Sequence, residues 1–354
     1  MTPEIAIILA QDGVTTGAVY VLLALGIVLV FLVTRVIFVP FGDVVGYSAL
    51  TLAALQIGKL PGTVWLVATL AAIATLMETI DLVRRRDIRR LPRALLFYAV
   101  VPLATIVPVV LLAGRELPSF LAVGLTIGLV LPISPLLYRI AFRPLAGASV
   151  LILLMVAVAL HYAMSGLALL YFGPEGFRTR AMTNAAFDLG PLNVSGQSLL
   201  IVLASVVFSA LLFLFFERTM TGKALRATSV NRTGARLMGI QPATTGAIAF
   251  LLASGLASIS GILIGPVTTF YYDSGFLIGL KAFVGAIIGG LVSYPLAAIG
   301  AIFVGLLEAY ASFFSSTLKE VIVFGALIPI LVWRSIIAAG DVEEEIDEEE
   351  RETV

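Results

Sequence analysis

Residues Gly13–Phe31 have the sequence GVTTGAVYVLLALGIVLVF, with no charged side chain. About 20 mostly apolar residues in an α-helix cross the roughly 30 Å hydrocarbon core of a bilayer. This stretch therefore predicts a transmembrane helix. Asp12 stands directly before it and no basic residue precedes it. We expect no cleavable signal peptide here, because such peptides begin with a basic segment.

The chain as a whole is similarly apolar. Of its 354 residues, 60% are hydrophobic and 12% are charged, whereas a soluble domain has about 45–50% and about 25%. The mean hydropathy is +1.09. This composition excludes soluble enzymes, nucleic-acid binders and secreted disulfide scaffolds. With no cysteine and a single histidine, His161, the sequence predicts neither disulfides nor a metal site.

The sequence predicts an all-α polytopic membrane protein with about eleven transmembrane or re-entrant helices. Two of the segments, 40–57 and 280–293, are short and rich in glycine, which leaves open whether they cross the membrane fully. The predicted segments are 13–34, 40–57, 63–83, 94–113, 119–138, 149–172, 198–216, 244–266, 280–293, 296–313 and 319–337.

Basic residues give the predicted orientation, because cytoplasmic loops carry an excess of Lys and Arg. With the N-terminus outside, 16 of the 22 basic residues lie in inner loops and in the tail, and five lie in outer loops. The longest inner run of arginines falls within Leu82–Arg93. An odd number of crossings then places the C-terminus in the cytoplasm.

We assign residues 1–338 to a single transmembrane domain. It includes an inner loop at 217–243 and an outer loop at 173–197, which we expect to form a small cap. Nine acidic residues and one basic residue lie in Asp341–Val354. A segment with so many like charges and so few apolar residues does not bury enough surface to fold. We therefore predict that 339–354 is a disordered acidic tail in the cytoplasm.

The inner loop contains the most informative motif, GKALRATSVNRTGARLMGI at Gly222–Ile240. Its apolar residues recur at roughly helical spacing among four basic residues, and glycines divide it into two short helices. The residues alone leave three interpretations open. The loop is an amphipathic helix pair on the membrane surface, a solvated positive-inside loop, or a knob that docks in a groove of a partner.

The spacing T-x-x-G-x-A-x-R-A … A-x-L-M-G-I, followed by a helix of small residues, resembles the membrane permease subunits of bacterial branched-chain amino-acid ABC importers of the LivH type. Related urea and amide permeases share it. Other segments match this family in the same order, and together they cover about four fifths of the chain. They are GVTTGAVYVLLALGIVLVF (Gly13–Phe31), FRPLAGASVLILL (Phe142–Leu154), FLLASGLASISGILIGP (Phe250–Pro266), GLKAFVGAIIGGLVSYP (Gly279–Pro295) and GAIFVGLLEAYASFFSS (Gly300–Ser316).

The chain departs from the family pattern in three places. The family has F-A-H-G followed by an acid after the first span, whereas Phe38–Asp43 is FVPFGD, which lacks the histidine and keeps the acid as Asp43. The family closes its last span with a Pro-x-Gly-Leu-type turn, where this chain continues as WRSIIAAGD. The segment from about 81 to 131 resembles an insertion of two helices preceded by a basic loop.

The resemblance implies a LivH-type ABC permease fold and a permease subunit of an ABC importer in a bacterial or archaeal plasma membrane. Such a subunit translocates branched-chain or other small amino acids by alternating access. The implied partners are membrane lipid, a second permease subunit, two cytoplasmic ATPase subunits that bind ATP and Mg, and a periplasmic or extracellular solute-binding protein. The chain itself is expected to be no enzyme and to bind no cofactor, since it has no G-x-x-x-x-G-K-[ST] phosphate-binding loop.

The resemblance also implies that the inner loop is the coupling helix that seats in the ATPase. The loop residues implied in this role are Gly222, Lys223, Ala224, Arg226, Ala227, Arg232, Ala235, Arg236, Met238, Gly239 and Ile240.

Ionisable side chains within the membrane are candidates for the translocation path, because they are costly in hydrocarbon. These candidates are Asp43, Asp273, Lys281 and Glu308. Each has an alternative role as a structural ion pair or a snorkelling group, and pairing of Lys281 with Glu308 is compatible with either role. For Glu78, near the inner edge, we favour a structural role. For His161 we favour a hydrogen bond to a neighbouring span over a proton relay.

Two other classes of protein compete with the importer subunit. A secondary transporter driven by an ion gradient explains the intramembrane charges without partners but leaves the inner loop unexplained. A scaffold or assembly factor is the other class. The sequence names neither the solute nor whether the two permease subunits are identical.

Overall fold

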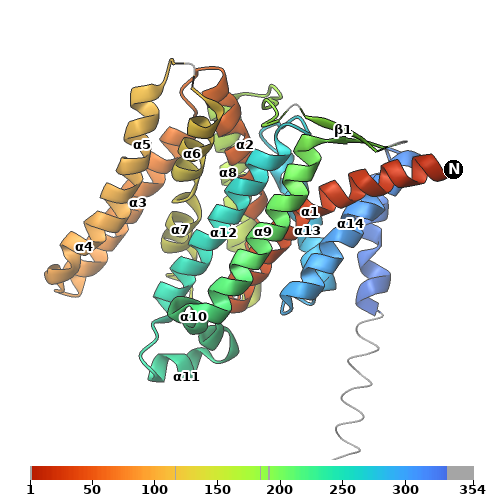
Figure 1. The fold of residues 1–354 in the computed structure, drawn as a ribbon. Helices are drawn as coiled ribbons and strands as arrows, with labels where there is room; N and C mark the ends of the chain where they lie inside the picture. The colour runs from red at the N-terminus through yellow and green to blue at the C-terminus, as the bar shows by residue number, and fades with distance from the viewer. Residues whose placement is uncertain (1, 116, 184, 190–191, 333–354) are drawn as a thin grey trace, which may run out of the picture.

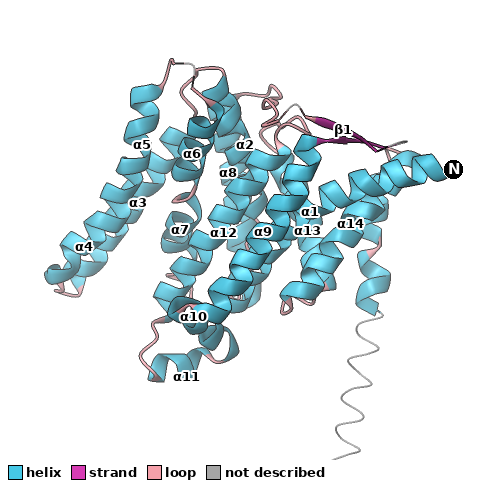
Figure 2. Cartoon of the chain, in the orientation of Figure 1, coloured by secondary structure: helices cyan, strands magenta, loops and turns pink. Residues whose placement is uncertain are grey.

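The computed structural model describes residues 2–115, 117–183, 185–189 and 192–332, which form a bundle of helices (Figure 1). The helical class predicted from the sequence is confirmed. Figure 2 shows helices throughout this part of the chain, with one small two-stranded hairpin. The predicted acidic tail at 339–354 and the end of the last predicted span, at 333–337, lie outside the described residues.

The elements of the described chain follow in this order. They are α1 (Pro3–Thr34), α2 (Phe41–Gln56), α3 (Thr63–Arg84), η1 (Ile88–Arg90), α4 (Leu91–Leu95), η2 (Leu96–Val100), α5 (Val101–Leu112), α6 (Ser119–Val130), α7 (Ile133–Leu137), η3 (Tyr138–Phe142), α8 (Val150–Phe172), β1 (Ala186–Leu189), β2 (Leu192–Ser195), α9 (Gly196–Arg218), α10 (Met220–Val230), α11 (Arg232–Leu237), α12 (Pro242–Ile264), α13 (Ser274–Ile288), α14 (Tyr294–Phe314) and α15 (Lys319–Gly325). The two strands pair antiparallel, with Ala186 opposite Ser195, in the loop predicted to be a cap.

Eight helical segments of the described chain are long and apolar enough to cross a membrane. In two of them short helices join end to end, as Leu91–Leu112 and as Ser119–Phe142. α2 and α13 are shorter, with 16 and 15 residues. At about 1.5 Å per residue they reach only roughly 22–24 Å, less than the thickness of the hydrocarbon core. Short helices are therefore present at both places where the sequence predicts them.

Two helix boundaries differ from the predicted segments. α1 begins at Pro3 rather than near residue 13, because proline is well tolerated in a first helical turn and the residues after it continue the helix. α13 covers Ser274–Ile288 instead of 280–293. Gly290 and Leu291 have φ angles of 70° and 60°, and this left-handed backbone ends the helix.

α1 lies at the centre of the bundle. Its middle residues Leu22, Leu23 and Ala24 have no exposed surface, and it contacts α9, α12, α13 and α14. In contrast, only 22% of the apolar window of α8 and 17% of that of α9 are buried. Apolar helices that are exposed on most sides face lipid or another membrane subunit.

α3 and Leu91–Leu112 form a hairpin at one edge of the bundle (Figure 1). Ion pairs with two arginines in and directly after η3 anchor the C-terminal part of α3. Arg139, whose side chain is 3% exposed, contacts Glu78 and lies 2.6 Å from Asp81, and Arg143 lies 3.0 Å from Glu78. The structural role favoured for Glu78 is confirmed. That the segment from about 81 to 131, which begins at the end of α3, is an insertion relative to the family stays a prediction.

Small residues allow the central helices to approach backbone to backbone. A Cβ atom added at Gly261 of α12 would lie 2.8 Å from Cβ of Ser48 and would overlap the carbonyl oxygen of Val45, both on α2. A Cβ atom at Gly279 of α13 would lie 2.7 Å from Cα of Gly42. α2 is therefore held between α12 and α13, and this packing fixes the helix that carries Asp43.

Gly261→Ala is expected to lower the free energy of unfolding by about 1–3 kcal/mol, because the new methyl group forces α12 away from α2. Gly255→Ala is the matched control on the same helix. Its Cβ atom would meet only Leu131, at an ordinary distance of 3.5 Å, so we expect little loss. Thermal unfolding in detergent micelles measures both variants, and equal effects would contradict this account of the packing.

Candidate functional site

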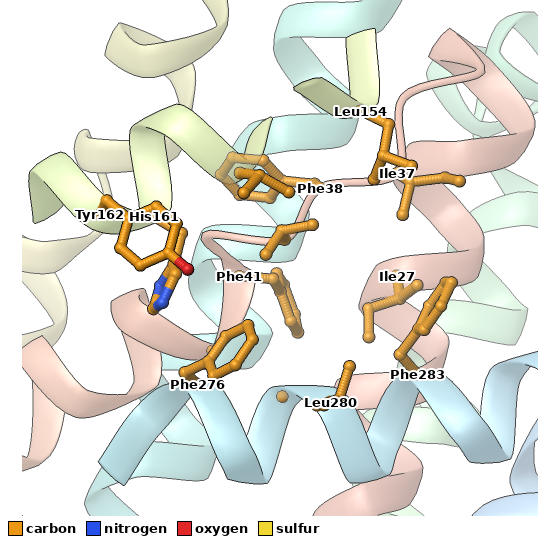
Figure 3. A pocket seen from close by; sticks show the side chains of 14 residues that line it. Ile27, Ile37, Phe38, Phe41, Leu154, His161, Tyr162, Phe276, Leu280 and Phe283 are labelled. Carbon is orange, nitrogen blue, oxygen red and sulfur yellow. The ribbon is translucent and has the colours of Figure 1, made fainter. Parts of the chain in front are cut away.

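A cavity of about 250 Å³ lies beside the break between α1 and α2. Its walls come from α1, α2, α8, α13 and the connection at 35–40. Figure 3 shows that its lining consists mainly of aromatic and aliphatic side chains, with the imidazole of His161 beside Phe276 at one end. The cavity is therefore apolar except at the end where His161 lies.

The break that shapes the cavity follows from the local sequence. Arg35 adopts a φ of 61° and ends α1. The connection at 35–40 is not helical, and its last residue, Pro40, directly precedes the first turn of α2. That first turn contains Asp43, and the N-terminal end of a helix stabilises a negative charge. The segment FVPFGD thus places a carboxylate at the start of a short helix inside the bundle.

The fold brings Asp43 and His161 together. Nδ1 of His161 lies 3.0 Å and 2.9 Å from the two carboxylate oxygens of Asp43. Both side chains are buried, with exposed fractions of 9% for His161 and 3% for Asp43. The imidazole also stacks on Phe276, with 4.1 Å between ring centroids. Because His161 is halfway along α8 (Val150–Phe172), this pair lies near the middle of a membrane-crossing helix.

The predicted hydrogen bond from His161 to a neighbouring span is confirmed, but its partner is not predicted from the sequence. Asp43 and His161 are separated by 118 positions, and helical periodicity carries no information over such a distance. One signal was available. Phe38–Asp43 keeps the acid of the family pattern without its histidine, while His161 is the single histidine of the chain.

Lys281 and Glu308 form a second buried group. Nζ of Lys281 lies 2.6 Å from Glu308 and 2.9 Å from Glu320, and Nζ of Lys319 lies 3.7 Å from Glu308. The hydroxyl of Tyr20 donates a hydrogen bond of 2.6 Å to the other oxygen of Glu308. The pairing of Lys281 with Glu308 considered from the sequence is confirmed. The charges of the two lysines and the two glutamates balance. With Tyr20, these side chains connect α1, α13, α14 and α15.

The four residues predicted for the translocation path thus lie in three different parts of the structure. Asp43 does not line the cavity itself but is bonded to His161, which does. Lys281 and Glu308 lie in the ion-pair network and do not line the cavity either. Asp273 is exposed directly before α13 and joins neither group. A role of these residues in translocation stays a prediction.

The two short helices expected in the inner loop are present as α10 and α11. The hydroxyl of Thr219 accepts a 2.9 Å hydrogen bond from the N–H of Gly222, and the Asn231 side chain accepts one of 2.8 Å from Gly234, as helix N-caps do. A Cβ atom at Gly222 would lie 2.7 Å from Cα of Phe216. Only glycine therefore fits the tight corner between α9 and α10.

The loop has one packed face and one free face. Leu225 is fully buried, and α10 contacts α1, α9 and α12. In contrast, Val230, Leu237 and Met238 are 81–83% exposed. A groove of about 450 Å³ separates α10 from α11 and is bordered by Arg226 and Met238. An exposed apolar surface with basic side chains beside it is typical of a protein-docking site.

The loop residues implied in coupling differ in how exposed they are in the structure. Two of them, Gly222 and Ala235, are buried and serve the structure of the loop itself. Three, Ala224, Arg232 and Ile240, are half-buried. The exposed ones are Lys223, Arg226, Ala227, Arg236, Met238 and Gly239. Contact with an ATPase stays a prediction for all of them.

Known proteins show similarity along most of the chain. A family model described as branched-chain amino acid transport system / permease component matches residues 9–332. The high-affinity branched-chain amino acid transport system permease protein BraD of Pseudomonas aeruginosa is 30% identical over 204 residues, which are 55% of this chain and 66% of BraD. The corresponding protein LivH of Salmonella typhimurium is 30% identical over 203 residues, 55% of this chain and 65% of LivH. The chain thus spans just under two thirds of the length of these relatives. No solved structure matches it.

Proposed function

This chain belongs to the family of branched-chain amino-acid transport permease components, and on that premise we propose that it is the permease subunit of an ATP-binding-cassette importer. It is a multi-pass membrane protein with eight apolar helices of membrane-crossing length in its described part. The proposed solute is a branched-chain or other small amino acid. The proposed location is a bacterial or archaeal plasma membrane, with the N-terminus outside and the C-terminus in the cytoplasm.

The free face of α10 and α11 is the observation that carries this proposal. Val230, Leu237 and Met238 are its exposed apolar side chains. The helices α10 and α11 lie at the opposite end of the bundle from the strand hairpin (Figure 1). An exposed apolar surface of this kind marks a site where a partner protein binds. The chain has no phosphate-binding loop of its own, so the proposed partner is an ATPase subunit that supplies the energy.

The packed face of the loop provides a mechanical connection to the cavity. Leu225 and the tight corner at Gly222 join α10 rigidly to the bundle, and α10 contacts α1 and α12 directly. α1 in turn contributes Ile27 to the cavity wall. In the proposed mechanism, closure of the ATPases moves α10 as a lever, and the helices rock between outward-facing and inward-facing states.

The proposed complex contains two ATPases that bind ATP and Mg, a second permease subunit and an external solute-binding protein. The exposed apolar surfaces of α8 and α9 are available to lipid or to the second permease. A secondary transporter is the second candidate function, and the buried Asp43–His161 pair favours it. That alternative leaves the free face of α10 and α11 without a role.

Purification of the tagged chain in mild detergent, followed by mass spectrometry of what accompanies it, tests the proposal. We expect two ATPase subunits and a second permease. A homo-oligomer without ATPase would overturn the importer and favour a gradient-driven mechanism centred on the buried charges.

A further inference from the structure

The size of the cavity limits what it can hold. Its volume of about 250 Å³ equals about eight water molecules at roughly 30 Å³ each, and it is smaller than the roughly 300–1,000 Å³ of sites for drug-sized ligands. Phe283 lines the end away from His161, and Phe41 and Leu280 lie between the two (Figure 3). The space is therefore suited to a small molecule with an aliphatic part.

The other end of the cavity is polar and electronegative. Nδ1 of His161 is held by both carboxylate oxygens of Asp43, which leaves Nε2 of the same ring for a second partner. Among the described residues no hydrogen bond to Nε2 is present. A neutral imidazole that donates its Nδ1–H to an ionised Asp43 presents the Nε2 lone pair to the cavity and leaves the carboxylate charge behind it without a cation. In a buried site the attraction of such a charge for a cation is far stronger than in water. An ammonium group is favoured here, while a carboxylate would meet a like charge.

Tyr162 lies beside this end. Its ring centroid is 5.2 Å from that of His161, its hydroxyl is turned toward the imidazole (Figure 3), and the residue is 71% exposed. Val158, one helical turn earlier on α8, is 37% exposed and also lines the cavity. The cavity therefore opens beside α8, and a hydroxyl donor stands at the opening.

We propose that this cavity is a transient binding site for an aliphatic amino acid within the membrane domain. The ammonium group is placed at the His161–Asp43 pair, the hydrocarbon side chain lies among Phe41, Leu280 and Phe283, and the carboxylate accepts a hydrogen bond from Tyr162. This inference rests on the proposed transport function. It adds that the permease itself selects for an ammonium group beside an aliphatic chain.

A single thiol in the cavity tests the proposal, because the chain has no cysteine. Val158→Cys is a small change at a partly exposed wall position. The rate of its reaction with N-ethylmaleimide is measured on the full chain in membranes of its own host. L-leucine at about four times its Kd is expected to slow the reaction about fivefold. Isopentylamine, which keeps the ammonium group, should protect as well, and 4-methylpentanoate, which lacks it, should not.

Asp43→Asn in the Val158→Cys background is expected to abolish protection by leucine, because it removes the charge and keeps a hydrogen-bond acceptor for His161. Asp273→Asn is the matched control, since that carboxylate is exposed and outside the cavity, and protection should remain. Equal protection by 4-methylpentanoate, protection that survives Asp43→Asn, or a thiol that does not react at all would each overturn the proposal.

This assay needs no ATPase. It therefore tests the cavity site independently of whether the chain is an importer subunit. A complex with its ATPases that takes up leucine without protecting the thiol would overturn the cavity site and leave the importer standing. Protection in a chain that purifies without ATPases would support the site and overturn the importer.

Discussion

Lys281→Met is expected to lower the free energy of unfolding by about 3–5 kcal/mol, the cost of removing one partner from a buried ion pair. The Lys281 side chain is 6% exposed and contacts Glu308 and Glu320 at 2.6 Å and 2.9 Å. Methionine preserves the volume but leaves two carboxylates without their shared cation. Thermal or chemical unfolding in mild detergent micelles measures the loss.

Lys319→Met is the matched control for this prediction. Its side chain is 34% exposed and its Nζ lies 3.7 Å from Glu308, so we expect a loss of only about 0–1 kcal/mol, as for exposed pairs. Adding Glu308→Gln to Lys281→Met removes one of the two carboxylates that lost this cation and should recover part of the stability. Equal losses for the two lysine variants would contradict a central role for Lys281 in the network.

The double charge reversal Arg226→Glu with Arg236→Glu is expected to reduce the ATPase that accompanies the purified chain at least about tenfold. Both residues are exposed on α10 and α11, and the Arg226 contact with Glu217 is an exposed 3.1 Å ion pair, so the fold should persist. Charges without matching partners at a protein interface cost about 2–5 kcal/mol of binding free energy. Quantitative mass spectrometry of the purified complex measures the ratio of ATPase to permease.

Arg89→Glu with Arg93→Glu changes the net charge by the same amount at another exposed site, near the tip of the α3 hairpin. This control should insert in the membrane and retain its ATPase. Membrane insertion of both double variants is checked by fractionation. A stable complex with normal transport-coupled ATPase activity in the Arg226 and Arg236 variant would remove the docking role of the loop.

Several features of this protein follow from short stretches of sequence. An uncharged run such as Gly13–Phe31 needs a hydrocarbon environment, and a helix is the structure that satisfies its backbone hydrogen bonds there. The all-α class and the membrane location follow from such runs. The pair of short helices in the inner loop also follows locally, since Asn231 and Gly222 act on their own neighbours.

Helix ends were predicted less well because tertiary packing decides them. α13 begins at Ser274, earlier than its apolar pattern indicates, and it crosses α2 where Gly279 meets Gly42. A Gly-rich apolar run has the same hydropathy whether it forms a helix or a left-handed turn. Periodicity therefore does not reveal that α13 ends at Ile288, just before the turn at Gly290. Lys281 and Glu308 are 27 positions apart, and their charges within apolar runs sufficed to suggest that they pair.

The pairing of Asp43 with His161 is what the tertiary structure alone decided. Each residue by itself is an isolated polar group in an apolar helix, and such a group must find a partner in the bundle because hydrocarbon offers none. The sequence by itself determined that these costly groups exist and that they lie within the membrane. Which of them meet depends on how α2 is held between α12 and α13 and how α8 lies against it, and helix packing of this kind is set by contacts between residues far apart in the chain.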